Sequence, residues 1–60
     1  MKETLNKIAN TCSILMVKAQ CFDLHDDKKE VLKDMAEQID SIYENFAILL
    51  KEFKDVSNED

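Results

Sequence analysis

The sequence predicts an all-α protein: an antiparallel two-helix hairpin that homodimerises into a four-helix bundle. The 60-residue chain contains no Gly and no Pro, which are the usual residues of tight turns and strand bulges. Apolar residues recur at alternating spacings of three and four in two long segments, as in packed helices. A chain this short seldom gains more than about 3–5 kcal/mol from one core, so association is expected.

The first helix is expected at about residues 3–24. Its apolar stripe has the spacing of a helix that faces a neighbour in a bundle. We assign this stripe to the core and dimer seam, and its members are Leu5, Ile8, Cys12, Leu15, Ala19 and Phe22.

The connection is expected at about residues 24–27. Asp27 followed by Glu30 resembles a capping box, in which a side-chain oxygen accepts a hydrogen bond from a free amide at the helix start. Since no Gly is present, we expect His25 or Asp26 to adopt the left-handed conformation that often ends a helix.

The second helix is expected at about residues 28–56, followed by a short acidic tail at 57–60, within one domain of residues 1–60. A short connection makes the helices antiparallel neighbours, which pairs residues whose numbers add to about 54, such as Cys12 and Ile42. Phe53 then extends beyond the first helix. The seam residues of the second helix are Leu32, Met35, Ile39, Ile42, Phe46, Leu49 and Phe53.

A second apolar stripe lies on nearly the opposite side of the first helix. At about 100° per residue, its members point away from the first stripe, so one bundle core cannot cover both. We expect this stripe to bind a protein partner, and it consists of Ile14, Val17, Cys21 and Leu24.

The net charge of -5 is unevenly distributed. Residues 1–24 hold three lysines against two acids, whereas residues 25–60 hold five lysines against eleven acids. This balance, and the complete absence of Arg, argue against nucleic acid and anionic membranes as partners. The exclusive use of Lys indicates an AT-rich coding genome, bacterial or phage.

Cys12 and Cys21 are separated by roughly 13 Å along one helix, too far for a disulfide within the chain. Two unpaired thiols without a signal segment predict a reducing, cytoplasmic location. The longest apolar run, Ile14 to Val17, is too short to cross a bilayer.

Two groups of polar residues were weighed as chemical sites. The first matches no metal-binding spacing, so we interpret it as solvated turn residues and expect neither metal nor cofactor; it comprises Cys21, Asp23, His25, Asp26 and Asp27. The second is an acidic ridge without a concave pocket, which we interpret as a solvated face; it comprises Asp34, Glu37, Asp40 and Glu44. The sequence therefore predicts a non-enzymatic regulatory or adaptor protein.

The alternative is an RNA ligand. The size, the two helices and the short polar turn resemble the Rop type of RNA-modulating dimer over nearly the whole chain, by architecture alone. That resemblance implies a homodimer that contacts RNA, and here an edge of Lys7, Thr11 and Lys18 would serve. The segment "MAEQIDSI" is also similar to the signature of small sporulation phosphatases: Asp40 matches the family Asp, but Ala36 replaces the family Ser, so no activity is carried over.

Overall fold

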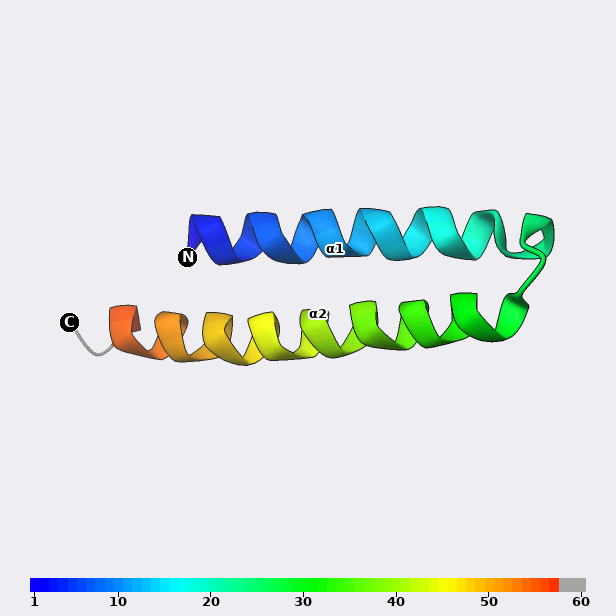
Figure 1. Ribbon diagram of the computed structural model, residues 1–60. Helices are drawn as coiled ribbons and strands as arrows, with labels where there is room; N and C mark the ends of the chain where they lie inside the picture. The colour runs from blue at the N-terminus through cyan, green and yellow to red at the C-terminus, as the bar shows by residue number, and fades with distance from the viewer. Residues whose placement is uncertain (58–60) are drawn as a thin grey trace.

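The computed structural model describes residues 1–57, which form two antiparallel helices lying side by side (Figure 1). Helix α1 spans Lys2–Gln20, a short 3-10 turn η1 spans Phe22–Leu24, and helix α2 spans Lys28–Ser57. The predicted all-α hairpin is confirmed. Of the expected acidic tail, Ser57 is the last residue of α2, and residues 58–60 lie outside the described part of the chain.

Helix α1 ends at Gln20, four residues before its expected end at 24. The Cys21 N–H still donates to the Val17 carbonyl at 3.0 Å, and then the Leu24 N–H donates to the Cys21 carbonyl at 3.0 Å. The chain therefore tightens into the three-residue hydrogen bonds of a 3-10 turn, in which the carbonyls of Cys21 and Phe22 are the acceptors.

The expectation of a left-handed residue in the connection was wrong. No residue of the described range 1–57 has a positive φ, and His25 is extended, with φ of -87° and ψ of 138°. Because the 3-10 turn already reverses the chain and only β-region angles follow it, a sequence without Gly needs no left-handed residue here.

Helix α2 begins as the capping box predicted. The Asp27 Oδ1 accepts the Glu30 N–H at 3.1 Å, and the Asp27 carbonyl accepts the Val31 N–H at 3.3 Å. Asp27 is thus the N-cap residue, and one of the orphan amides of the first turn is satisfied.

The two helices differ in length, 19 residues against 30, so the C-terminal end of α2 projects past the start of α1 (Figure 1). Val56 lies in this projection and is 53% exposed, whereas Phe53, 59% exposed, follows Glu52, which contacts Met1 and Thr4 at the start of α1. The long axis of the molecule measures 53 Å, whereas the other two measure 15 and 11 Å. The hairpin is therefore a single layer of two helices.

The face that each helix turns toward the other, termed the helix interface, mixes apolar and polar residues. Thr4 Oγ1 donates to Glu52 Oε1, and Lys18 Nζ lies 3.7 Å from Asp34 Oδ2. These two contacts bracket the register in which residue numbers add to about 54. The residues of the helix interface are partly or fully buried, and they include Thr4, Ile8, Thr11, Leu15, Lys18, Phe22, Val31, Met35, Gln38, Ile42, Asn45, Leu49 and Glu52.

One chain buries few apolar side chains completely. Among the described apolar residues only Val31 is buried, at 7% exposure, while 14 large ones remain exposed. Neither helix, within residues 1–57, is apolar over a length that would span a membrane. The hairpin is therefore held mainly by partly buried contacts at the helix interface.

Candidate functional site

The seam residues are divided into two sets by the structure. Every second one along each helix is partly buried in the helix interface: Ile8, Leu15, Phe22, Met35, Ile42 and Leu49. The others are exposed: Leu5, Cys12, Ala19, Leu32, Ile39, Phe46 and Phe53. A single hairpin thus covers one flank of each stripe and leaves the other flank in water.

The exposed flanks of both helices lie on the same side of the hairpin. Each exposed seam residue comes one residue after a residue of the helix interface, so its side chain is rotated by about 100° around the helix axis. Because the two helices run antiparallel, this rotation brings the exposed seam residues of both helices to the same side of the hairpin. The combined surface, termed the broad face, consists of Leu5, Ala9, Cys12, Met16, Ala19, Leu32, Ala36, Ile39, Tyr43, Phe46, Leu50 and Phe53, all exposed.

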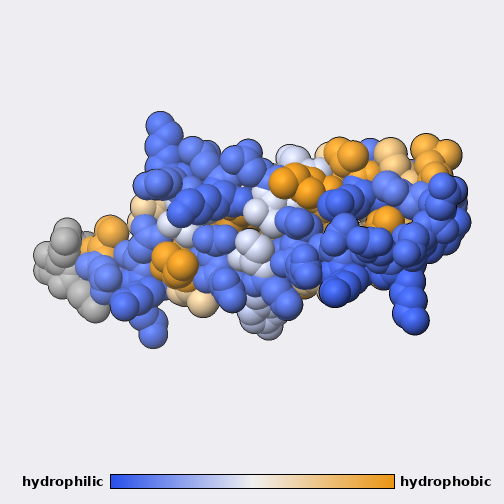
Figure 2. Space-filling model, in the orientation of Figure 1, coloured by the Kyte–Doolittle hydropathy of each residue, from blue (hydrophilic) through white to orange (hydrophobic). Residues whose placement is uncertain are grey.

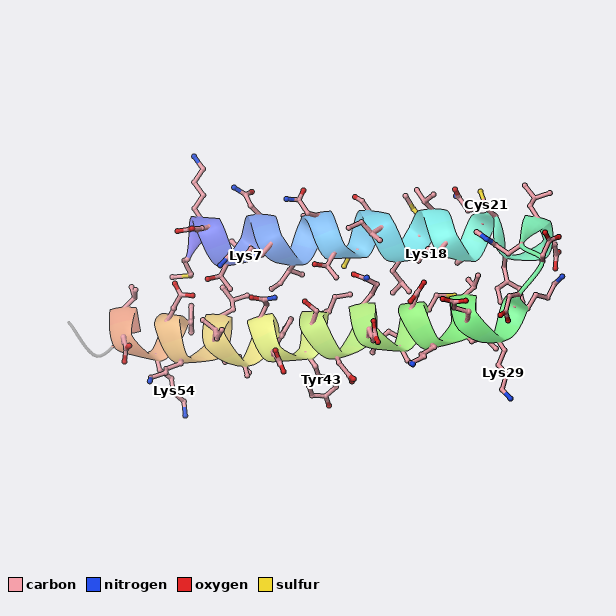
Figure 3. The ribbon with its side chains drawn as sticks, viewed as in Figure 1. Lys7, Lys18, Cys21, Lys29, Tyr43 and Lys54 are labelled. Carbon is pink, nitrogen blue, oxygen red and sulfur yellow. The ribbon has the colours of Figure 1, made fainter. Side chains whose placement is uncertain are left out.

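The broad face is hollowed along α2. A depression of about 450 Å³ is lined by Ile42, Tyr43, Phe46, Ala47 and Leu50. Tyr43, which is 78% exposed, points away from α1 (Figure 3). Apart from the Tyr43 hydroxyl, these side chains offer no polar group, so the depression suits an apolar side chain.

The residues that the sequence assigned to a partner are termed the narrow strip: Ile14, Val17, Cys21 and Leu24. Ile14 and Val17 lie on the other side of α1, Cys21 is its C-cap, and Leu24 belongs to η1. Ile14, Val17 and Leu24 are 47%, 54% and 82% exposed, and Cys21 is partly buried. Figure 2 shows hydrophobic atoms gathered over the C-terminal half of α1 on a face that is otherwise mostly hydrophilic. A shallow depression of about 360 Å³ is lined there by Ser13, Ile14, Val17 and Lys18.

Acidic residues of α2 adjoin the narrow strip. Lys18, at the edge of the strip, is 3.7 Å from Asp34, which belongs to the acidic ridge. A polar depression of about 370 Å³ near the start of α2 is lined by four acids and two lysines: Asp27, Glu30, Asp34, Glu37, Lys29 and Lys33. The narrow strip is therefore bordered on its α2 side by charges of both signs, with the acids in the majority.

The proposed RNA edge does not form an open row of cations. Lys18 faces Asp34, and the partly buried Thr11 Oγ1 donates to the Lys7 carbonyl at 2.8 Å within α1. Lys7 alone of the three is exposed.

The remaining chemical candidates stay apart. Cys12 is exposed on the broad face, and no group of three or more metal-ligating side chains comes together within the described residues. The pKa of Glu52 is lowered, first by its hydrogen bond with the Met1 amino group and then by the one from Thr4. Its Oε2 lies 2.7 Å from the Met1 nitrogen, so this carboxylate ties the two helices together.

Sequence reasoning missed the polar part of the helix interface. Thr4, Thr11 and Lys18 recur every seven residues immediately before the seam residues Leu5, Cys12 and Ala19. On α2 the residue immediately before the first exposed seam residue is Val31, the one buried apolar residue of the described chain. This seven-residue recurrence was the available signal.

No family model matches the chain, and no curated protein or solved structure matches it significantly.

Proposed function

We propose that this protein is a non-enzymatic binding module of the regulatory or adaptor kind. Two copies associate through the broad face into a four-helix bundle, and each copy docks a protein partner on the narrow strip. One observation carries the proposal: two apolar surfaces lie on opposite sides of a hairpin that buries Val31 alone among its described apolar residues.

The size of the broad face supports association between copies. Eight of its large side chains are 49–78% exposed: Leu5, Met16, Leu32, Ile39, Tyr43, Phe46, Leu50 and Phe53. Together they offer on the order of 800 Å² per copy, which is the contribution of one partner to an interface of standard size. A monomer seldom leaves an apolar patch of this extent in water.

The narrow strip is left over once the broad face is covered, because it points out of the bundle. Its spacing of three and four residues fits one face of an amphipathic helix. Since the acids of the adjoining α2 depression outnumber its lysines, four against two, the complementary partner carries Lys or Arg beside its apolar residues. A helix with an apolar stripe and a basic edge is therefore the proposed ligand.

The same charges count against the RNA alternative. Lys18 is already opposed by Asp34, and the neighbouring ridge is acidic, so the edge that would face phosphates carries little free positive charge. For catalysis the apolar depression offers only Tyr43 as a titratable group. Neither observation favours a second function.

Sedimentation equilibrium tests the first half of the proposal. We expect a dimer at micromolar concentration, with a melting temperature that rises with protein concentration because association stabilises the fold. A stable, helical monomer throughout the micromolar range would contradict it.

A displayed peptide library tests the second half. The wild-type protein is the bait, and the Val17→Asp variant is the counter-selection bait, since a charge at the centre of the narrow strip abolishes an apolar dock. We expect selected peptides to share apolar residues at helical spacing with Lys or Arg beside them. Peptides that bind both baits equally, or that share no such pattern, would refute the narrow strip as the docking surface.

A further inference from the structure

We propose that the second copy on the broad face lies antiparallel, with the two connections at opposite ends and the two-fold axis passing through Cys12. This inference rests on the proposed dimer and specifies its arrangement. The occupant of the broad face is thus a second copy of this chain, with α1 against α1 and α2 against α2.

The register of α2 against itself supports this arrangement. An axis that crosses α2 between Ile42 and Tyr43 places Leu32 opposite Phe53 of the second copy. The same axis places Ile39 opposite Phe46, so all four exposed seam residues of α2 are paired without a slip. Phe53, which is 59% exposed at the level of the first residues of its own α1, is thereby covered.

The depression on α2 fits the same register. Tyr43, Phe46, Ala47 and Leu50 stand at positions i, i+3, i+4 and i+7, which is the four-residue hole that receives a knob from a facing helix. The antiparallel register brings Ile39 of the second copy over this hole. An apolar side chain of that size suits its apolar lining.

The hairpin register gives the position of the same axis on α1. Cys12 lies level with Ile42 in the hairpin, because the contacts Thr4 to Glu52 and Lys18 to Asp34 bracket that level. The axis that bisects α2 therefore also crosses α1 at Cys12.

Residue sizes and charges complement one another about this axis. Leu5 meets Ala19 of the second copy, large against small, and Met16 and Leu50 come within one position of Ala9 and Ala36. At the two ends, the exposed Lys2 comes opposite the exposed Asp23. Layers of this kind fill a core without voids and fix its register.

The other arrangement, with both connections at the same end, leaves a defect. It sets α1 against α2 of the second copy, and Phe53 then faces only the first residues of a shorter helix. It also puts the two Cys12 residues on diagonally opposite helices. The arrangements are therefore distinguished by the distance between identical residues.

Disulfide trapping measures that distance. Diamide removes two hydrogens from a pair of thiols and leaves an S–S bond, which requires Cα atoms closer than about 7 Å. The Cys21→Ser variant keeps only Cys12, which lies on the axis, and we expect most of it to become a covalent dimer. The matched Cys12→Ser variant keeps only Cys21, far from the axis, and we expect it to remain uncrosslinked.

A second measurement changes the broad face only at Cys12. With both cysteines replaced by Ser, a spin label on Lys29→Cys reports the separation of the two connections. Residue 29 lies 13.5 residues from the axis in each copy. In the antiparallel dimer the two labels are therefore about 40 Å apart along the bundle, at 1.5 Å per residue. Connections at the same end bring the labels to within about 25 Å, the width of a bundle with its side chains.

The outcomes separate the two proposals. The antiparallel arrangement is overturned if the protein is a dimer by sedimentation but forms the disulfide through Cys21, forms it through neither cysteine, or gives the short label distance. The proposed function still stands in those cases. A monomer by sedimentation overturns both. A dimer that traps through Cys12 alone and gives the long distance supports the axis through Cys12.

Discussion

The helix interface and the broad face are two sides of the same apolar stripes, yet they differ in chemistry. The helix interface carries Thr4, Lys18, Asp34 and Glu52 among its apolar residues, whereas the broad face is apolar except for the Tyr43 hydroxyl. Polar contacts join the two helices at the helix interface, and the apolar side chains of the broad face stay exposed.

This difference indicates where the stability of the fold resides. Exposed and partly exposed ion pairs contribute little, typically about 0–1 kcal/mol each. Burial of large apolar side chains contributes about 1.5–3 kcal/mol each. The broad face is therefore expected to dominate stability, and the helix interface to set register and orientation.

The largest expected effect comes from a charge at the centre of the broad face. Phe46→Asp is expected to cost more than about 3 kcal/mol per chain, because it removes a large apolar contact and desolvates a carboxylate. Sedimentation and far-UV circular dichroism at micromolar concentration should show a monomer with reduced helicity.

Ile48 gives the matched control for that variant. It is also 50% exposed on α2 but lies outside the broad face. Ile48→Asp is expected to remain a helical dimer. Equal losses in Phe46→Asp and Ile48→Asp would refute a special role for the broad face.

The C-terminal end of α2 gives the next effect. Phe53→Ala is expected to destabilise the fold by about 2 kcal/mol per chain, since the antiparallel partner buries this ring. Leu24→Ala, at an 82% exposed position of the narrow strip, should stay within about 0.5 kcal/mol of wild type. Urea unfolding measures the stability of both variants. If Phe53→Ala left the free energy of unfolding unchanged, nothing would cover the end of α2.

A smaller effect is expected at the start of α2. Asp27→Ala removes the acceptor for the Glu30 N–H and should cost about 1 kcal/mol, whereas the exposed neighbour Asp26→Ala should be nearly neutral. Thermal unfolding of the two variants at one protein concentration tests this. If Asp26→Ala lowered the melting temperature more than Asp27→Ala, the assignment of Asp27 as the N-cap would be wrong.

The smallest effect concerns the helix interface itself. The lowered pKa of Glu52 means that its ionised form is favoured in the fold, so its contribution is present above the ordinary carboxyl pKa and is lost as the pH falls through the folded value. Glu52→Gln should therefore lower the melting temperature slightly at pH 7 and leave it unchanged at acidic pH. A difference that grows toward acidic pH would contradict this sign.

Much of the fold followed from spacing and from one cap. The alternating apolar pattern identified both helices, and Asp27 with Glu30 marked the start of α2. The end of α1 was placed too late, because Phe22 and Leu24 continue the helical spacing while the backbone has already tightened into a 3-10 turn.

The surfaces were harder to assign than the helices. Periodicity gives the direction in which a stripe points, but it does not show which flank a neighbouring helix covers. The position of Thr4 and Val31 inside the helix interface depends on that choice, as does the exposure of Cys12. The narrow strip could be predicted from the sequence because Ile14, Val17 and Leu24 point away from both flanks.

The placement of the narrow strip on the side of the hairpin opposite the broad face bears on stoichiometry. A two-fold dimer carries two such strips, which look outward from opposite sides of the bundle and lie toward opposite ends. One rigid ligand cannot reach both at once. The proposed dimer is then a bivalent bridge that holds two ligands apart at a fixed separation, and we expect its complexes to saturate at two ligands for every two chains.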